Sequence, residues 1–417
     1  MKPIFSVLNL EKSHQPKRLG SSLFSVGEMY SRLKAFRLAL DRQGLMEKPL
    51  YFVKVDVKSC FDTIPQRRLL DVIKALLSLE DYRVRQHVEV NAVVPCRYSN
   101  NIGSAAKPVK RYLAQARGTG DRRDFAEFLR RQLRIKSRSS TVFVDSVVEQ
   151  KQSKEEVMKL LTEHVERNII KIGKKFYRQK TGIPQGSVLS SLLCSFFYAE
   201  LEADLLSFLR PDTSVLLRLI DDSLLITTER QHAERFLRVM HAGSEDYGVG
   251  ITKEKTLLNF ICSVDGTEVP RLPSLTSFPY CGMLINTGNL NISKDFRPKA
   301  PREFSKLPGQ TFHRKTLNAL KIQLHAMLLD TSFNLEYTVL GNLYRCFADA
   351  ARKCFEYLKC LPAQKRNSDG LLITLASATM RRKREGRRAA AWQGYQCEKQ
   401  LKKALWLPRN PNGGLVD

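Results

Sequence analysis

Three aspartates stand at the ends of short apolar runs that lie far apart in the chain. Asp56 lies near the end of the run Phe52–Val57, and Asp221 with Asp222 interrupts a second run at 215–228. A carboxylate inside such a run is costly to bury unless something pairs with it. Mg²⁺ prefers oxygen ligands and is commonly held by one or two carboxylates together with substrate phosphates. These residues therefore predict a magnesium site and phosphoryl or nucleotidyl transfer.

The charge of the chain indicates the same class of partner. Its 417 residues include 69 Lys and Arg against 42 Asp and Glu, a formal net charge of +27. Such an excess favours association with phosphate backbones through counterion release. The alternative is a merely basic soluble protein, and the three aspartates within apolar runs make this alternative the less favoured one. No membrane partner is expected, because the uncharged stretch 181–199 is interrupted by Pro184, two glycines and four serines. The length predicts two or three domains.

The nine cysteines form no Cys-x-x-Cys pair and predict no zinc site. Cys346, Cys354 and Cys360 fall along an apolar helical stretch, so we interpret them as buried free thiols. This usage is typical of a reducing, intracellular compartment.

The pattern of apolar residues predicts an alternation of strands and helices. Helices are expected over 26–43, 67–79 and 188–209, and a strand over 52–57 is expected to turn into the second of them. Ser153 and Glu156 have the spacing of a capping box that opens a helix as far as Ile169. Hairpins are predicted around Gly173 and over 215–228, where the tip would project two carboxylates, with an ordinary Asp-rich turn as the alternative. Further strands are expected at 257–262 and 280–285.

Two basic regions flank this core. Lys and Arg far outnumber acids over 97–138, and an amphipathic piece within it predicts an inserted basic subdomain. A single Arg there is best read as part of a solvated surface, whereas the cluster favours nucleic-acid contact. Beyond Pro298 helical spacing predicts an all-helical domain. The run Arg381–Arg388 fits a nuclear import signal or a phosphate-gripping helix equally well, and the tail from 410 is expected to be disordered.

These segments, in this order, resemble the reverse transcriptases and, in detail, the telomerase reverse transcriptase family. The resemblance rests on five motifs, which are Val53–Val57 with Phe61–Pro65, Gln179–Ser187, Leu217–Asp222, Thr256–Phe260 and Tyr280–Leu284. Retroviral and intron-type enzymes usually have an aromatic residue two positions before the Asp pair, where this chain has Leu219. The long basic insertion between Asp62 and Gly182 is similar to the family's insertion in fingers. A retroelement reverse transcriptase is the runner-up.

The resemblance implies a two-metal polymerase site. Asp56 and Asp221 would bridge two Mg²⁺ ions with support from Asp222, and such ions stand about 3.5–4 Å apart. Phe61 matches the position that screens the sugar of the incoming nucleotide, where many telomerases have Tyr.

Further roles follow from the same resemblance. Gln185–Gly186 would line the nucleotide and template pocket, and a Gly-rich loop before a helix lets backbone approach such a ligand closely. Lys255 corresponds to the proposed acid for the departing pyrophosphate, with Lys253 as a rival and an exposed loop lysine as the alternative for either. Cys281–Gly282 matches the primer grip.

The implied fold is an α/β (α+β) reverse-transcriptase palm with partial fingers and an inserted basic helical subdomain, followed by an all-helical thumb. Its domains would be residual fingers at 1–50, a palm at 51–290 with the insertion at about 80–165, and a thumb at 291–417. The implied partners are telomerase RNA as template, a single-stranded telomeric DNA primer, dNTPs and the RNA–DNA heteroduplex, in the nucleus at chromosome ends. The family's N-terminal domain, RNA-binding domain and two finger motifs are not expected here, so a truncated, non-catalytic nucleic-acid-binding form is a further alternative.

Overall fold

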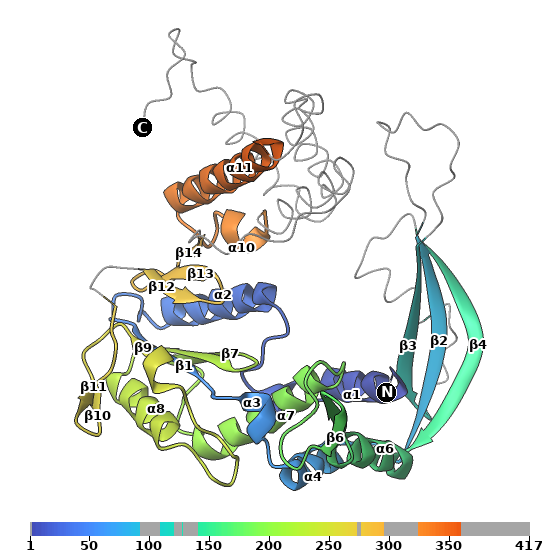
Figure 1. The fold of residues 1–417 in the computed structure, drawn as a ribbon. Coiled ribbons are helices and arrows are strands. Elements are labelled where there is room, and N and C mark those ends of the chain that lie inside the picture. The colour runs from blue at the N-terminus through green and yellow to red at the C-terminus, as the bar shows by residue number, and fades with distance from the viewer. Residues whose placement is uncertain are drawn as a thin grey trace, which may run out of the picture.

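The computed structural model describes residues 2–91, 109–120, 127, 141–272, 277–295 and 324–359. Over these residues the protein is a mixed α/β structure around a central four-stranded sheet (Figure 1). The predictions made for the amphipathic part of segment 97–138, for residues 298–323, for Arg381–Arg388 and for the tail lie outside the described residues.

The central sheet has the strand order β7-β8-β1-β9 and is antiparallel throughout. Its strands are β7 (Ser214–Leu219), β8 (Asp222–Thr227), β1 (Tyr51–Asp56) and β9 (Leu257–Leu258). The predicted strand and hairpin are thus confirmed, whereas the strand expected over 257–262 shrinks to two residues. The side chain of Asn259 takes over the pairing there, since its Oδ1 accepts from the Phe52 N–H and its amide donates to the Leu50 carbonyl, both at 2.8 Å.

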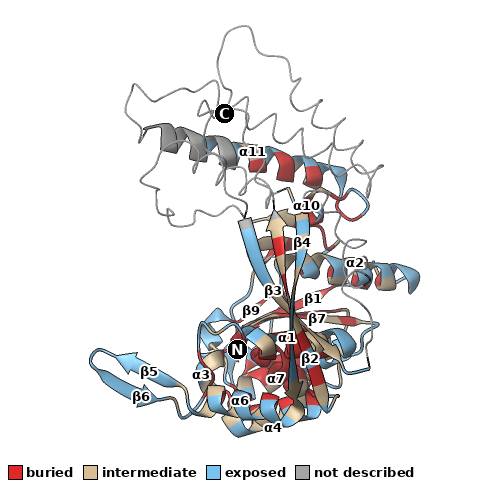
Figure 2. Cartoon of the chain, turned by 90° about the vertical axis from the view of Figure 1, so that its right-hand side faces the viewer, coloured by how far each residue is buried: buried red, intermediate tan, exposed pale blue. Residues whose placement is uncertain are grey.

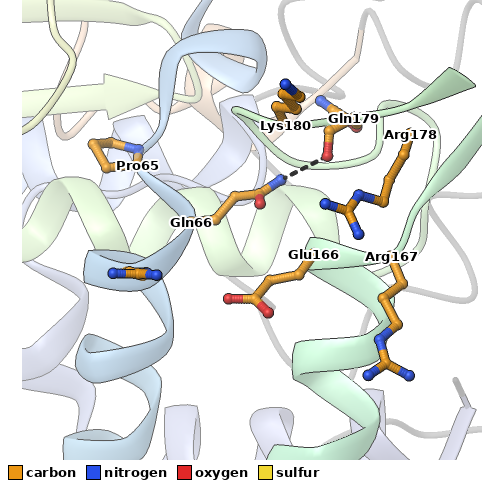
Figure 3. A pocket seen from close by; sticks show the side chains of 8 residues that line it. Pro65, Gln66, Glu166, Arg167, Arg178, Gln179 and Lys180 are labelled. Carbon is orange, nitrogen blue, oxygen red and sulfur yellow. Dashed lines mark hydrogen bonds between the residues drawn. The ribbon is translucent and has the colours of Figure 1, made fainter.

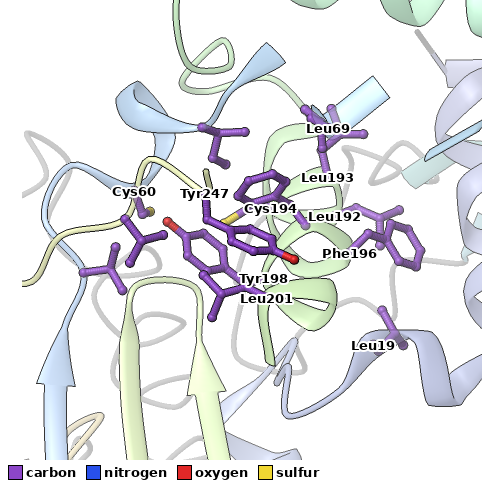
Figure 4. Close-up of a cluster of buried hydrophobic side chains, with 14 of the residues drawn as sticks. Leu19, Cys60, Leu69, Leu192, Leu193, Cys194, Phe196, Tyr198, Leu201 and Tyr247 are labelled. Carbon is purple, nitrogen blue, oxygen red and sulfur yellow. The ribbon is translucent and has the colours of Figure 1, made fainter. Parts of the chain in front are cut away.

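The two faces of this sheet pack into two separate cores, because successive side chains of a strand point to opposite sides. Val53 and Leu225 belong to the core under one face, and Phe52 and Leu224 belong to the core above the other. The first core is covered by α4 (Gln66–Leu76), α7 (Ser190–Leu205) and α8 (Arg230–Ala242), and Figure 4 shows the part of it around α7. The second lies under α2 (Val26–Arg42) and a small C-terminal sheet.

The predicted helices are present with shifted ends. Met29, Leu33, Phe36 and Leu40 of α2 are all buried, as their spacing requires. The helix α4 ends at Leu76 rather than 79, because Leu77 adopts an extended conformation. The helix α7 is shorter than the predicted 188–209 at both ends.

The described strands of the insertion form a sheet, so the subdomain is not wholly helical, while the amphipathic piece predicted within 97–138 lies outside the described residues. The three antiparallel strands β2 (Asp81–Asn91), β3 (Val109–Gly118) and β4 (Thr141–Ser153) take the order β3-β2-β4. The helix α1 (Lys2–His14) packs against them, with Ser6 Oγ donating to the Ala114 carbonyl at 2.8 Å. The alternation that buries Tyr82 and Val84 while exposing Arg83 is a strand pattern, and it prevails over the basic composition.

The capping box and the hairpin that follow it are confirmed. The Glu156 N–H donates to Ser153 Oγ and the Ser153 N–H donates to the Glu156 carboxylate, each at 3.1 Å, at the start of α6 (Lys154–Glu166). After α6 come β5 (Ile169–Ile172) and β6 (Lys175–Arg178), joined at Gly173, whose φ is +63°. This hairpin projects from the body of the protein and is exposed along its length (Figure 2).

The C-terminal part of the described chain is a small sheet followed by helices. The sheet consists of β12 (Ser277–Tyr280), β13 (Met283–Asn286) and β14 (Ile292–Lys294). The single strand predicted over 280–285 is wrong, because Cys281 and Gly282 both have positive φ, +48° and +75°, and turn the chain into a hairpin. The helices α10 (Ala326–Leu329) and α11 (Glu336–Lys359) follow as expected. Cys346 on α11 is buried as predicted, while the side chains of Cys354 and Cys360 lie outside the described part.

Short elements complete the description. They are η1 (Pro16–Leu19), α3 (Cys60–Thr63), η2 (Lys253–Lys255), β10 (Ser263–Val264) and β11 (Thr267–Glu268). Among the described helices, none is both long and apolar enough to cross a bilayer.

Candidate active site

The three aspartates meet where β1 ends beside the β7–β8 turn. Asp56, the last residue of β1, is the register partner of Asp222, the first residue of β8. The N–H of Val57 donates to the Asp221 carbonyl at 3.0 Å, which ties the turn to the chain that leaves β1. Asp56 and Asp222, 166 positions apart in sequence, are therefore neighbours across one strand pair, as the predicted site requires.

The β7–β8 turn carries backbone strain. Ile220 has a φ of +61°, although a β-branched residue strongly disfavours the left-handed region. Such a conformation costs on the order of 1–3 kcal/mol and persists only where the surroundings fix it. Here the paired strands on both sides hold the turn and present Asp221 at its tip.

Two lysines neutralise two of the carboxylates. Lys255 Nζ lies 2.8 Å from Asp56 Oδ2, and Lys54 Nζ lies 3.3 Å from Asp222 Oδ1. The hydrogen bond to Asp56 raises the pKa of Lys255 and keeps the ammonium protonated at neutral pH. The Lys255 side chain is 64% exposed against 11% for Asp56, so this ion pair is easily exchanged.

Among the residues that the structure describes, none forms an ion pair with Asp221. Burial, followed by the charges of Asp222 and Asp56, raises the pKa of Asp221 above the ordinary value for a carboxyl group. A carboxyl group whose ionised form is disfavoured in a partly buried, acidic setting is a common mark of a functional position.

The Gly182–Ser187 loop packs directly against the segment that follows β1. The Ile183 N–H donates to the Phe61 carbonyl at 2.7 Å, and the Gly182 N–H donates to the Ile64 carbonyl at 2.9 Å. A Cβ on Gly182 would lie 2.4 Å from that Phe61 oxygen, and the φ of Gly182 is +76°. Only glycine fits this close approach, which brings the predicted nucleotide loop beside Phe61.

Within this loop two side chains are anchored by residues that the sequence analysis did not single out. The Gln185 amide donates to the carboxylate of Asp62 at 2.9 Å to Oδ1 and 3.0 Å to Oδ2. Ser187 Oγ lies 3.0 Å from His164 Nε2, and burial lowers the pKa of His164, so the ring is neutral at pH 7. Gly186 is exposed between these anchors.

The Cys281–Gly282 turn is fixed to the aspartate hairpin from above. The buried hydroxyl of Tyr280 lies within hydrogen-bonding distance of the Leu217 and Asp222 carbonyls, at 3.1 Å and 3.0 Å. Burial and the nearby Asp222 raise the pKa of Cys281 to about 11, so its thiol stays protonated. The turn predicted to grip a primer end therefore lies next to the aspartates.

Behind the turn, a buried ion pair fixes the edge strand. Arg218 Nε lies 2.6 Å from Glu202 Oε1 on α7, and the two side chains are 3% and 11% exposed. Arg218 Nη2 also donates to Ser22 Oγ at 2.6 Å, and the Leu23 N–H donates to the Arg218 carbonyl at 2.7 Å. The N-terminal segment and α7 thus hold β7 three residues before Asp221.

The donor set of the site suits a divalent cation in its chemistry. Three carboxylates on adjoining strand ends offer only oxygen, and the raised pKa of Asp221 indicates a carboxylate in need of a positive partner. Within the residues that the structure describes, no group of three or more His, Cys, Asp or Glu side chains converges closely enough to hold a metal ion. The side chains of Asp56 and Asp222 instead point to their lysines.

The structure brings most of the predicted site residues to one place. Asp56, Asp221 and Asp222 adjoin one another and Lys255 contacts Asp56. The Cys281–Gly282 turn follows Tyr280, which bonds to Asp222, and the Gly182–Ser187 loop packs against Phe61. Sequence reasoning missed Lys54, although it stands two residues before Asp56 and hence on the same face of β1. Asp62 and His164 gave no such signal, because their partners are more than twenty positions away.

Comparisons with known proteins agree with these motifs. Residues 142–285 match the family model described as reverse transcriptase (RNA-dependent DNA polymerase). The telomerase reverse transcriptase of Bos taurus is 33% identical over an alignment of 364 residues that covers 83% of this chain and 31% of that protein. That of Mus musculus is 29% identical over an alignment of 392 residues that covers 90% of this chain and 34% of that protein. The chain therefore spans about a third of the length of these relatives.

The fold also has a solved counterpart. A telomerase from Candida albicans, in a complex with the TWJ fragment of telomeric RNA, matches with a TM-score of 0.57 at 18% identity, over 90% of this chain and 51% of that chain. The resemblance to telomerase reverse transcriptases, predicted from the motifs, is confirmed over about four fifths of the chain.

Proposed function

We propose that this chain, a relative of the telomerase reverse transcriptases, is an RNA-directed DNA polymerase that adds telomeric repeats to chromosome 3′ ends by copying a bound RNA template. The observation that carries the proposal is the pairing of Asp56 with Asp222 across two antiparallel strands, with Asp221 at the tip of the strained turn. Nucleotidyl transfer is almost entirely positioning and charge stabilisation, which a fixed carboxylate pair can provide.

We assign the subdomains as the sequence suggested. Residues 51–290 would form the palm, with the insertion at about 80–165, residues 1–50 a remnant of the fingers, and residues 291–417 the thumb. The helices α10 and α11 support a helical thumb. The strand β14 lies past the proposed boundary and pairs with β13, and Asn342 of α11 donates to the Ile292 carbonyl at 3.0 Å, so the thumb would be joined tightly to the palm.

Asp56, Asp221 and Asp222 would hold two Mg²⁺ ions. Bound ions would activate the primer 3′-hydroxyl and stabilise the departing pyrophosphate. The chain's own part is to keep the carboxylates adjacent, which the paired strands favour, while two neighbouring lysines offset the charges of Asp56 and Asp222.

The remaining residues would bind and orient the substrates. Phe61, fixed against Gly182, would place its ring under the sugar, where a bulky side chain leaves no room for a ribose hydroxyl. Gln185, oriented by Asp62, would line the nucleotide and template pocket with Gly186. The Cys281–Gly282 turn would hold the primer end.

Lys255 would donate a proton to the leaving pyrophosphate. Its raised pKa keeps that proton available at neutral pH, and its exposure lets the side chain leave Asp56 and reach the substrate. The neighbouring Lys253 is exposed and forms no ion pair with an aspartate within the described residues, which favours Lys255 for this role.

The partners follow from this function. They are a telomerase RNA template, a single-stranded telomeric DNA primer, dNTPs and the RNA–DNA heteroduplex, met in the nucleus at the telomeric region of chromosomes. The net charge of +27 supports binding to such polyanions.

The test is Mg²⁺-dependent dNTP incorporation by the full chain on an RNA template with a DNA primer. Asp221→Ala should lower incorporation by roughly 10²-fold or more. Asp212→Ala, which removes an exposed carboxylate from the other end of the same hairpin, should leave the rate unchanged. Incorporation that survives Asp221→Ala would refute the proposed site.

The product pattern tests the telomerase assignment separately. A ladder with a short fixed period supports repeat addition, while smooth run-off on arbitrary templates supports a retroelement enzyme. Salt-sensitive nucleic-acid binding with no incorporation by the unaltered chain would support the non-catalytic alternative.

A further inference from the structure

A basic cavity of about 620 Å³ lies outside the aspartate site, between the start of α4, the end of α6 and the end of β6 (Figure 3). Four cationic side chains line it, those of Arg67, Arg167, Arg178 and Lys180. Its one acidic lining residue is Glu166, which extends toward the space beside Gln66. The lining therefore carries a clear excess of positive charge.

The walls of the cavity are fixed by Gln66. Its side-chain amide lies within hydrogen-bonding distance of three backbone carbonyls, those of Val165 and Gly182 at 3.0 Å and that of Gln179 at 3.4 Å. One side chain thus joins α4, α6 and the strand that leads into the glycine loop. The cavity is held in place by the same contacts that position that loop.

The cations of the cavity are available to a ligand. Within the described residues, the side chains of Arg67, Arg167, Arg178 and Lys180 make no hydrogen bond or ion pair with the protein, and all four residues are exposed. Arg178 extends toward the space beside Gln66 (Figure 3). Arginines without protein partners, gathered in one cavity, suit the oxygen atoms of a phosphate group.

The β5–β6 hairpin extends this cavity outward with apolar and aromatic side chains. Ile172 is 64% exposed, Phe176 69% and Tyr177 50%. A two-stranded hairpin that packs against nothing is only marginally stable. Apolar side chains exposed on such a hairpin mark an interaction site. Figure 2 shows the hairpin projecting from the body of the protein.

One face of the hairpin combines the two kinds of side chain. Arg178 pairs with Ile169, and Phe176 pairs with Lys171, whose Nζ lies 5.6 Å from the centre of the Phe176 ring. Because side chains two apart on a strand share a face, Phe176 lies beyond Arg178 on the side that reaches the cavity.

The charge of the segment decides which partner suits it. Residues 167–185 contain no acidic residue, and their cations are Arg167, Lys171, Lys174, Lys175, Arg178 and Lys180. A protein partner would need a matching acidic surface. Basic grooves interleaved with aromatic rings are instead the usual means of binding unpaired nucleotides, since every base has a face that can stack.

We propose that the cavity and the β5–β6 hairpin form a binding site for single-stranded nucleic acid, separate from the three aspartates. The cavity arginines bind backbone phosphates, and Phe176 stacks on a base of the same strand. The inference rests on the charge and exposure of this region and does not require polymerase activity.

The phosphate contacts are tested through the salt dependence of binding. Fluorescence anisotropy with a labelled oligo(dT) or oligo(U) of about twelve nucleotides is measured on the full chain in EDTA without dNTPs, so failure of the polymerase assay has no bearing on it. Each lost phosphate contact on a single strand lowers the log–log salt slope by about 0.7. Arg167→Gln with Arg178→Gln should therefore lower it by about 1.4. Arg210→Gln with Lys48→Gln, which removes the same charge from exposed sites elsewhere, should change it far less.

The stacking contact has its own variant. Phe176→Ala should weaken binding about tenfold with the salt slope unchanged. Tyr337→Ala, which removes an aromatic ring of similar exposure (66%) from α11, should leave the affinity unchanged.

Three results would overturn the inference. They are an unchanged slope in the double arginine variant, equal losses in the control variants, and competition by duplex DNA as strong as that by the single strand. Equal binding of the RNA and DNA oligomers, or a preference for either, supports it, because both present the same phosphates and bases.

Discussion

The buried ion pair behind the aspartate turn makes a strong prediction about stability. Arg218→Met would leave the Glu202 carboxylate, which is 11% exposed, without its cation. Removing one partner of a buried pair typically destabilises a protein by about 3–5 kcal/mol, because the remaining charge stays desolvated. The geometry places this pair in that range, since the Nε–Oε1 distance is 2.6 Å and Arg218 is also bonded to Ser22.

The double variant separates the charge from the packing. Arg218→Met with Glu202→Gln removes both charges but keeps an acceptor for the Ser21 N–H, which donates to Glu202 at 2.7 Å. We expect it to recover to within about 2 kcal/mol of the unaltered chain, since a buried pair and its neutral replacement often differ little. The Nη1 of Arg218 has no partner within the described residues, which further limits what the pair contributes.

Urea unfolding of the full chain at pH 7, followed by circular dichroism, measures these differences. The control is the exposed pair of Arg230 and Glu234 on α8, which are 2.8 Å apart with side chains 54% and 30% exposed. Arg230→Met should change the free energy of unfolding far less than Arg218→Met, because an exposed pair is screened by water. The reasoning fails if Arg218→Met costs under about 1 kcal/mol, or if the double variant is no more stable than the single one.

Three further predictions concern other positions. Gly186→Ala should lower the free energy of unfolding in urea by about 1–2 kcal/mol, because the φ of Gly186 is +81°. Gly182→Ala should cost more, because its Cβ would also lie 2.4 Å from a backbone oxygen. Equal costs would contradict this. Asp221→Asn should raise Tm at pH 7, because the raised pKa of Asp221 means that its ionised form is disfavoured in the folded state. The gain in Tm should shrink as pH falls through that pKa, where the carboxyl group becomes neutral. A lower Tm of the variant at pH 7 would count against this reasoning. Although burial opposes the ionisation of Asp330, hydrogen bonds led by that from Lys34 lower its pKa to about 2 from 3.8. The ionised carboxylate therefore contributes at most about 2 kcal/mol to stability, which is complete above pH 4 and lost between about pH 4 and 2. Asp330→Asn should flatten this loss of stability in acid when unfolding is measured against pH.

Local sequence patterns predicted the elements of the site well. Each of the strands and hairpins that carry the aspartates has a short period of alternating or continuous apolar residues, and each is bounded by residues that turn the chain. The capping box was found in the same way, because Ser153 and Glu156 satisfy each other's backbone groups within a single turn.

Long-range contacts were beyond such patterns. The anchoring of Gln185 by Asp62 joins segments 123 positions apart, and neither residue is unusual in its local context. Arg218 and Glu202, 16 positions apart, likewise show no local pattern that predicts their pairing. The strands of the insertion were missed for a different reason, since the two-residue alternation around Tyr82 is short and is followed by a strongly basic segment. The roles of Phe61, Lys255 and the two loops rest on the family resemblance and stay predictions.

Burial divides the ion pairs of the site into permanent and exchangeable ones. Arg218, 3% exposed, cannot leave Glu202 without stranding a desolvated charge, so it fixes β7 and with it the position of Asp221. Lys255, 64% exposed, loses little when it leaves Asp56, because water solvates the freed ammonium. The ammonium of Lys255 thus offsets the repulsion between the carboxylates, and another positive group can replace it. The strand that carries Asp221 stays fixed meanwhile. A rigid frame with a replaceable counter-charge is what a site that must alternately bind and release a charged substrate requires.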